Sequence, residues 1–384
     1  MHQNYLNYLV LFSICCSYFA AMERVVAYQT LLGFVKNVFL EVGCPDEDAC
    51  TAAYTLVDAD LRGVDSHGVA RLSGYVRLWE AGRVNSKPQI KIVHETPSTA
   101  LLDADAALGL VSAPYAMEMA IEKAKNAGTG WVCVQNSSHF GIAGHHAMMA
   151  LEHDMIGIAM TNASALVAPT FSKERMLGTN PIAMAVPAMA EPAFVADFAT
   201  AAAANGKLEI AQRNNEPIPQ GWAQTEDGTP TTDASILKKK GALLPLGSDK
   251  EHSSHKGYCL GSMVDILSGV LSGASYGPWA PPFPAYVPVP ENMPGKGLGH
   301  FLGAMRIDAF QPAEKFKLQM DNWIKRFRQA EPSGEENVII PGDVERLLEA
   351  ERRKIGIPLH ELVVADLDKL TEMLGLSKKI SILT

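Results

Sequence analysis

The sequence has fewer basic than acidic residues, so it lacks the positive surface that polyanions require. Its 384 residues include 33 Lys+Arg and 42 Asp+Glu, which gives a formal net charge of −9 at pH 7. Nucleic acids and anionic membranes bind mainly to Lys and Arg, and neither is expected as a partner. With 47% hydrophobic and 20% charged residues the chain is globular in composition, and its length predicts two or three domains.

Cysteine is scarce, and its spacing does not form a disulfide framework. The six cysteines are Cys15, Cys16, Cys44, Cys50, Cys133 and Cys259. No histidine or further cysteine near Cys44 and Cys50 completes a zinc site, and the histidine pairs 145–146 and 252–255 lack a third ligand. The sequence therefore predicts reduced thiols and no bound metal.

Long apolar runs are also missing. The run from Tyr8 to Ala21 has 14 residues, whereas a membrane-spanning helix needs about 20. We interpret residues 1–21 as an N-terminal extension, with two alternatives. In the first, residues 1–21 result from an upstream start or are a dispensable extension, and Met22 is taken as the first residue of the folded protein. In the second, they are a targeting segment, although the Lys or Arg that usually precedes the apolar run of a signal peptide is missing. The first alternative predicts a cytoplasmic protein and the second predicts the secretory pathway.

Several well-known motifs are absent. The chain contains no G-x-G-x-x-G, no phosphate-binding loop, no H-E-x-x-H and no G-x-S-x-G. A Rossmann dinucleotide site, a P-loop nucleotidase, a zinc protease and an α/β-hydrolase are therefore not supported.

The hydrophobic pattern predicts helices at both ends of the chain and an α/β region between them. Expected helices cover 25–57, 67–82, 113–125, 258–271 and much of the chain after Pro312. Within the first range, a new helix is expected to start at Pro45. Expected strands cover parts of 88–102, then 130–134, 155–161, 182–186, 194–197 and 301–307, and a Pro/Gly-rich loop covers 273–299. The predicted fold class is α/β, with residues 22–95 plus 320–384 as a discontinuous helical domain and 96–319 as an α/β domain.

The densest group of reactive side chains surrounds His67. Asp65 or Ser66 could cap a helix that starts there, and His67, Arg71 and Tyr75 would then lie on one stripe. A 2-hydroxy or 2-oxo acid would use this set, because Arg binds a carboxylate through two hydrogen bonds and His can take a hydroxyl proton. The alternative is a solvated polar helix face.

Further candidates follow predicted strands. His139 lies in Ser138-His139-Phe140-Gly141, after the strand at 130–134, where α/β proteins often bind ligands. A loop histidine bonded to its neighbours is the alternative. Asp197, at a strand end, could border a nucleotide or begin a helix, and Lys256-Gly257 could offer a charge and N–H groups to phosphate.

Together these segments resemble the malate/L-lactate dehydrogenase-like family of NAD(P)-dependent oxidoreductases over about residues 22–374. The matching motifs, in order, are Asp65-Ser66-His67-Gly68-x-x-Arg71, Ser138-His139-Phe140-Gly141, Gly178-Thr179-Asn180-Pro181, Asp197-x-Ala199-Thr200, Gly221-Trp222-Ala223, Gly228-x-Pro230-Thr231-Thr232-Asp233 and Lys256-Gly257. The resemblance implies a non-Rossmann nicotinamide-binding α/β domain joined to the helical domain, and a homodimer.

The resemblance also implies the roles of individual residues. His67 and His139 match positions implicated in proton transfer, Arg71 matches a substrate-carboxylate position, and Ser66 and Tyr75 lie beside it. The implied cofactor-binding residues are Ser164, Gly178, Thr179, Asn180, Asp197, His255, Lys256, Gly342 and Asp343. Two of them depart from the family pattern, since Asp343 stands where Glu is common and His255 where an aromatic residue is common.

The implied activity is hydride transfer between NAD or NADP, with a slight preference for NAD, and a small 2-hydroxy acid. Malate is the first expected substrate and lactate the second. The alternatives are an NAD(P)H-dependent reductase of cyclic imino acids, which also needs a carboxylate clamp and a proton donor, and a non-catalytic nucleotide-binding protein of the same fold.

Overall fold

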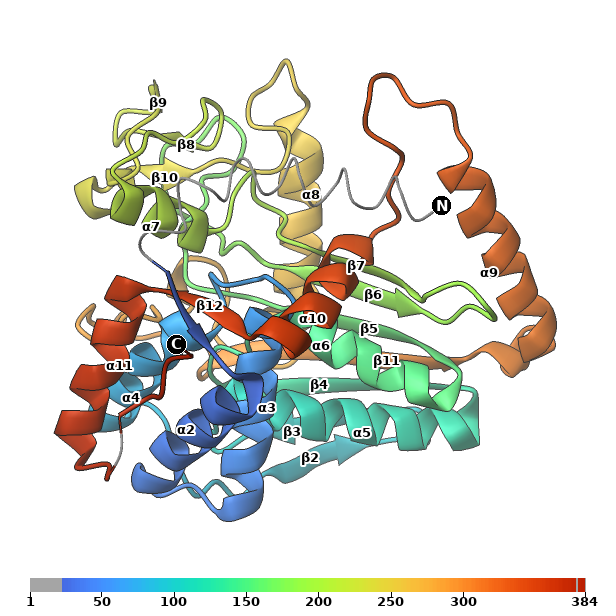
Figure 1. The fold of residues 1–384 in the computed structure, drawn as a ribbon, viewed down its shortest axis with the longest axis horizontal. Helices are drawn as coiled ribbons and strands as arrows, with labels where there is room; N and C mark the ends of the chain where they lie inside the picture. The colour runs from blue at the N-terminus through green and yellow to red at the C-terminus, as the bar shows by residue number, and fades with distance from the viewer. Residues whose placement is uncertain (1–22, 378, 384) are drawn as a thin grey trace.

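The protein is built around a mixed sheet of seven strands, as seen in a computed structural model that describes residues 23–377 and 379–383 (Figure 1). The strand order is β2-β3-β4-β11-β5-β6-β7, and only β3 and β4 run parallel. The strands are β2 (Lys91–Glu95), β3 (Thr99–Asp103), β4 (Thr129–Ser137), β5 (Met155–Thr161), β6 (Ile182–Val186), β7 (Phe194–Phe198) and β11 (Leu298–Arg306). The expectations for residues 1–21 lie outside the described part.

The middle of the sheet is buried on both faces. Side chains of β11 alternate, so His300, Leu302 and Ala304 face α5 (Gly109–Ala127) and α6 (Ala143–Met148). The opposite face meets α8 (Ser254–Asp265) and its π-helical continuation, Ile266–Val270. Alanines along α5 allow close packing. A Cβ on Gly130 of β4 would lie 2.0 Å from a carbonyl oxygen of this helix.

Helices from the two ends of the chain share a hydrophobic core. Helix α11 (Glu361–Leu374) packs against α2 (Tyr28–Glu41) and α4 (Leu72–Glu80), and α10 (Asp343–Ile355) packs against α3 (Asp46–Leu61). In Figure 1 these blue and red segments lie side by side. The predicted start after Pro45 is confirmed, and the three acidic residues of the first turn suit the helix dipole.

A short strand pair that sequence patterns missed also joins the two ends. Strand β1 (Glu23–Val26) pairs antiparallel with β12 (Ile357–His360), with Glu23 opposite His360. Four-residue strands carry too little periodicity to be recognised from sequence.

A small lobe follows β7. It contains α7 (Asn205–Asn214) and a three-stranded sheet of β8 (Ala223–Gln224), β9 (Pro230–Thr231) and β10 (Ala242–Leu243). Its own core includes Leu208 of α7, with Ile218 and Leu243. Later in the chain, α9 (Ala313–Arg328) crosses the end of the sheet beside β6 and β7 (Figure 1).

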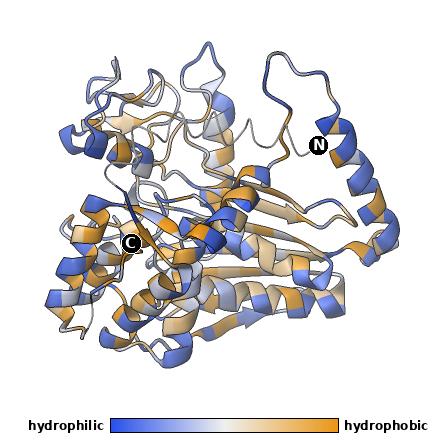
Figure 2. Cartoon of the chain, viewed as in Figure 1, coloured by the Kyte–Doolittle hydropathy of each residue, from blue (hydrophilic) through white to orange (hydrophobic). Residues whose placement is uncertain are grey.

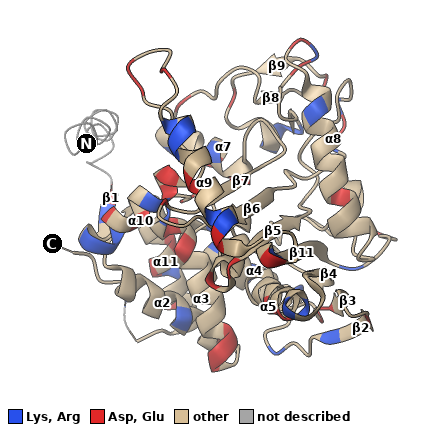
Figure 3. Ribbon diagram, turned by 90° about the vertical axis from the view of Figure 1, so that its right-hand side faces the viewer, with Lys and Arg blue, Asp and Glu red and all other residues tan. Residues whose placement is uncertain are grey.

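Surface chemistry follows this arrangement. Hydrophobic colour concentrates on the central strands and hydrophilic colour on outer helices and loops (Figure 2). In the view of Figure 3, acidic and basic residues are both scattered over the helices and loops, which agrees with the mixed charges of the sequence. No helix among the described residues combines the length and apolar character of a membrane span.

The α/β fold class is confirmed. The domain division stays a prediction: the shared core of the two ends favours it, while the pairing of β2 with β3 places residues 91–95 in the main sheet.

Candidate active site

His67 lies on a turn rather than in a helix, so the expected helix start at Asp65 or Ser66 is wrong. Residues 65–68 form turns and bends, Val69–Arg71 is a 3-10 helix, and α4 begins only at Leu72. The buried carboxylate of Asp60 replaces the expected cap, because its Oδ2 accepts the Val69 N–H at 2.7 Å. The Asp65 carboxylate is instead paired with Arg352 of α10.

The second histidine lies on the turn that follows β4. Ser138 anchors this turn: its Oγ accepts the Gly109 N–H at 3.0 Å and donates to the Ala107 carbonyl at 3.2 Å. Gly141 has a φ of +82°, which a side chain would disfavour. The turn is therefore anchored at α5, and it holds His139 against the helical core.

The two turns bring their histidines together. The rings of His67 and His139 stack with centroids 5.6 Å apart and an interplanar angle of 24°. Ser66 Oγ lies 2.8 Å from His67 Nδ1, and the Tyr75 hydroxyl lies 2.6 Å from His139 Nδ1. Tertiary folding thus assembles four of the predicted residues although no helical stripe exists.

The hydrogen bonds define which nitrogen of His139 carries its proton. Besides Tyr75, the backbone N–H of Gly141 points at Nδ1, at 3.3 Å. A backbone N–H can only donate, so Nδ1 accepts and the neutral ring carries its hydrogen on Nε2. The partner of His67 Nδ1 is a serine hydroxyl, which can donate or accept, so His67 is not restricted in this way.

Burial keeps both rings neutral. Burial, and then the nearby Arg71 charge, lowers the pKa of His67 to about 4. Burial also lowers the pKa of His139 well below its ordinary value, with further contributions from His67 and Arg71. Burial raises the pKa of the Tyr75 phenol, so this group remains a hydrogen-bond donor at neutral pH.

Arg71 is held from two sides. Its Nε donates to the Ser66 carbonyl at 2.7 Å. Its two terminal nitrogens pair with both carboxylate oxygens of Glu209 on α7, at 3.1 Å and 2.8 Å. Sequence analysis did not predict Glu209, because nothing in the local pattern of α7 shows that this helix packs against the His67 turn.

A second residue that sequence analysis missed is Phe283, in the long Pro/Gly-rich loop. Its ring centroid lies 5.1 Å from that of His139 and 5.3 Å from that of Tyr75. The Ser164 hydroxyl accepts the Phe283 N–H at 2.9 Å, so Ser164 connects the end of β5 to this loop. The unusual length of the loop was the available signal, but it did not identify the residue.

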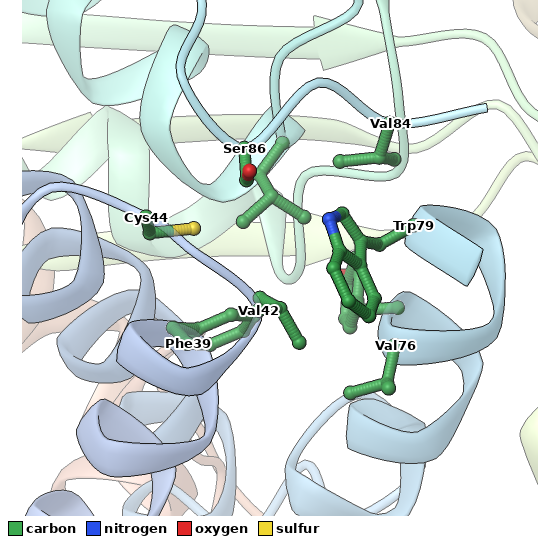
Figure 4. Close-up of a pocket in the computed structure, with 9 residues that line it drawn as sticks. Phe39, Val42, Cys44, Val76, Trp79, Val84 and Ser86 are labelled. Carbon is green, nitrogen blue, oxygen red and sulfur yellow. The ribbon is translucent and has the colours of Figure 1, made fainter. Parts of the chain in front are cut away.

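Two pockets adjoin these side chains. A cavity of about 160 Å³ is lined by His139, Asn136, Arg83 and Phe283, among others. Behind Tyr75 lies a pocket of about 10 Å³ between α2 and α4, where Phe39, Trp79 and Val84 face one another (Figure 4). The smaller pocket holds at most one water and is mainly apolar, so it is a packing gap rather than a substrate site.

The predicted cofactor residues fall into separate groups around the sheet. The Asn180 side chain is buried between the Ala163 N–H, at 3.1 Å, and the Gly261 carbonyl of α8, at 2.9 Å. Gly178 and Thr179 belong to the same turn, and the Thr179 carbonyl accepts from the Thr200 N–H. The Asn180 amide therefore ties α8 to the sheet.

Other members of the set lie at the β7 edge and on α8. The Asp197 carboxylate of β7 accepts the Gly144 N–H at 2.7 Å. A Cβ on Gly342 would lie 3.0 Å from Val195 of the same strand, and Asp343 is paired with Arg328 and Arg346. His255 and Lys256 are exposed in the first turn of α8.

No group of three or more potential metal ligands occurs in residues 23–377 or 379–383. In the same segments Cys44, Cys50, Cys133 and Cys259 are free thiols. His145 pairs with Asp58 at 2.9 Å and His146 is buried beside it, so this histidine pair serves the packing of α3 against α6.

Comparison with known proteins places this chain in a family of dehydrogenases. The sequence profile described as Malate/L-lactate dehydrogenase matches residues 26–368. A malate dehydrogenase of Pyrococcus abyssi is 44% identical over 347 residues, which is 90% of this chain and 93% of the relative. An L-sulfolactate dehydrogenase of Methanocaldococcus jannaschii is 38% identical and covers 89% and 95% of the two chains.

A solved structure agrees with these sequence matches. The malate dehydrogenase of Pyrococcus horikoshii superimposes with a TM-score of 0.84 at 38% identity and covers 94% of this chain and 97% of its own. The chain belongs to the malate/L-lactate dehydrogenase family. The predicted class, an oxidoreductase that acts on 2-hydroxy acids with a nicotinamide cofactor, is confirmed.

Proposed function

We propose that this chain catalyses reversible hydride transfer between C2 of malate and NAD, with lactate as the second substrate. The observation that carries the proposal is the pair of neutral, stacked imidazoles beside the Arg71 guanidinium. Relatives named malate dehydrogenase at 44% identity favour malate over other 2-hydroxy acids.

In this proposal Arg71 binds the substrate carboxylate. Its two terminal nitrogens already bind both oxygens of one carboxylate, that of Glu209, and this two-point contact supports the proposed role. The bond from Nε to the Ser66 carbonyl fixes the plane of the fork. The substrate C2 oxygen would then lie toward the two histidines.

The two histidines differ in their proposed roles. His139 donates a hydrogen bond from Nε2 to the substrate oxygen, because Tyr75 and Gly141 reserve its Nδ1 as an acceptor. His67 is the proton carrier, since the Ser66 hydroxyl accommodates its Nδ1 in either protonation state. General acid–base catalysis of this kind contributes about 10²–10⁴-fold to a rate.

The donor set around the sheet fits a nicotinamide cofactor in part. Lys256 and His255 are exposed at the first turn of the 12-residue helix α8. The Lys256 ammonium and the N–H donors of this turn suit a pyrophosphate. Ser164, Gly178, Thr179, Asp197, Gly342 and Asp343 are proposed to line the rest of the cofactor site. Asn180 would position this turn rather than donate to the cofactor, because its amide is already bonded. When bound, the nicotinamide supplies or accepts the hydride.

The test follows the absorbance of reduced nicotinamide in both directions. The panel contains L-malate, L-lactate, L-sulfolactate and the corresponding 2-oxo acids, each with NAD and NADP. We expect the highest kcat/KM with malate and NAD. Cofactor binding without turnover on any acid would favour the cyclic-imine or non-catalytic alternatives, and the absence of cofactor binding would refute the proposal.

We also propose a homodimer that covers the outer face of α8. Met263 of α8, Ile266 and Val270 of its π-helical continuation, and Leu271 just beyond are each about half exposed, at helical spacing. A second copy of the chain would remove this stripe from water. Light scattering tests the proposal. The wild type is expected to be a dimer and Ile266→Asp a monomer. A monomeric wild type would contradict the proposal.

The proposed location is the cytoplasm, because the cysteines within the described part of the chain are free thiols, which fits reducing conditions. Mass spectrometry of the mature N-terminus tests this proposal. Cleavage after a signal segment would favour the secretory pathway instead.

A further inference from the structure

The guanidinium that is proposed to bind substrate is already paired with a carboxylate of the protein. Glu209 contacts both terminal nitrogens of Arg71, with Oε1 at 3.1 Å and Oε2 at 2.8 Å. The side chains are 15% and 30% exposed, so solvent screens this ion pair only partly. A substrate carboxylate needs the same two nitrogens, and both carboxylates cannot occupy them at once.

Glu209 has other partners available on its own helix. Asn205 Nδ2 donates to its Oε1 at 2.8 Å, and Arg213 Nη2, one turn further along α7, lies 3.9 Å from its Oε2. The Arg213 distance is at the limit of an ion pair, and rotation of the Glu209 side chain could shorten it. The carboxylate could therefore leave Arg71 without becoming an unpaired, partly buried charge.

Helix α7 is packed directly onto the site. A Cβ on Gly206 would lie 2.4 Å from Ser66 Cβ and 2.9 Å from Arg71 Nη2. The backbone of α7 thus touches the turn that carries His67. Beside it, Lys207 Nζ lies 5.8 Å from the centre of the Trp222 ring, which belongs to the same small lobe. A shift of α7 would therefore change the surroundings of a tryptophan.

We propose that Glu209 is a positioning residue that occupies the Arg71 fork in the free enzyme and exchanges with the substrate carboxylate. On substrate binding, Glu209 transfers to Arg213 and Asn205 while Arg71 pairs with the substrate. Arg71 is paired in both states, so its orientation is fixed before substrate arrives and no uncompensated cation is exposed to the site. The competition also weakens the binding of every carboxylate ligand. This inference rests on the proposed role of Arg71 in binding substrate.

The principal test compares Glu209→Gln with wild type for two ligands. One is malate. The other is succinate, which has the two carboxylates of malate but no C2 hydroxyl and cannot transfer a hydride. Glutamine keeps the shape of the side chain but removes the competing charge, so the KM for malate and the inhibition constant of succinate should fall together by about three- to tenfold, with kcat changed less than twofold. Glu209→Asp, which keeps the charge, should remain closer to wild type.

The matched control is Glu216→Gln, which removes the same charge from an exposed position just beyond α7. Its KM and inhibition constant should stay within twofold of wild type. A fall of similar size in this control would assign the effect to net charge and overturn the proposal.

A second readout follows α7 directly. Succinate should change the tryptophan fluorescence of the wild type, with a smaller change in Trp222→Phe. If Glu209 merely anchors Arg71, Glu209→Gln should raise both the KM for malate and the inhibition constant of succinate. Such a rise would overturn the inference. So would the absence of a change in both constants. The proposed function fails separately, if Arg71→Lys leaves the KM for malate unchanged.

Discussion

The surroundings of His139 and of His67 differ in how strictly they fix the orientation and the tautomer of each ring. Around His139, an anchored turn, Tyr75 and the Gly141 N–H fix the ring and its tautomer. Around His67, the side-chain hydrogen-bond partner is a serine hydroxyl, and the nearby Arg71 guanidinium is paired with Glu209. One histidine is therefore suited to a fixed hydrogen bond, and the other to a proton that comes and goes.

The largest effect should come from replacing His67 with glutamine, and the same replacement at His139 provides the comparison. Glutamine can donate an N–H to an oxygen but cannot carry a proton, so His67→Gln should lower kcat about 10²–10⁴-fold, and His139→Gln should lower it much less. Cofactor binding, measured by fluorescence, should persist in both. His153→Gln, at an exposed histidine, is the control. Equal losses in the two variants would remove the distinction between the histidines.

The next effect concerns the fork of Arg71. Lysine keeps the charge but cannot make the bidentate contact, so Arg71→Lys should raise the KM for malate by about 10- to 100-fold. Steady-state kinetics measure this change, with the exposed Arg77→Lys as the matched control.

A smaller effect should come from Tyr75→Phe, which removes only the hydroxyl that faces His139 Nδ1 at 2.6 Å. His139 Nδ1 then keeps only the Gly141 N–H as a donor, so the tautomer and the orientation of the ring are less strictly fixed. We therefore expect kcat to fall about tenfold while KM changes little. A changed KM with normal kcat would place Tyr75 against the substrate instead of behind the histidine.

The smallest effect is on stability as a function of pH. The pKa of His67 is about 4 in the folded protein and about 6.5 in the unfolded chain. Between these values the unfolded chain binds more protons, so the stability that His67 contributes is complete above pH 6.5 and is lost as the pH falls toward 4. From pH 7 to 5.5 this loss is about 1 kcal/mol for one such group.

Urea denaturation at the two pH values measures this difference. In His67→Gln the decrease in unfolding free energy between pH 7 and 5.5 should be smaller than in wild type by that amount. An identical decrease in both proteins would show that His67 is already protonated or solvent-exposed in the folded state.

Local patterns were sufficient for much of the fold. Pro45 and the acidic residues after it predicted the start of α3. The spacing of apolar residues placed strands at 155–161 and 182–186, because side-chain periodicity expresses which face of an element is buried. The same patterns missed β1 and β12, whose pairing depends on residues more than 330 positions apart. They also predicted a helix at His67, because sequence does not show that Asp60 is buried beneath that turn.

The sequence by itself determined the chemistry of the site. It supplied two histidines, an arginine and a phenol in motifs that resemble one family, and the absence of a glycine fingerprint excluded a Rossmann site. Only the tertiary structure decided how these groups are arranged. It stacked His67 on His139, reserved one nitrogen for Tyr75 and Gly141, and placed Glu209 against Arg71. The physical reason is that distances, tautomers and ion pairs arise between segments distant in sequence, and local periodicity carries no information about them.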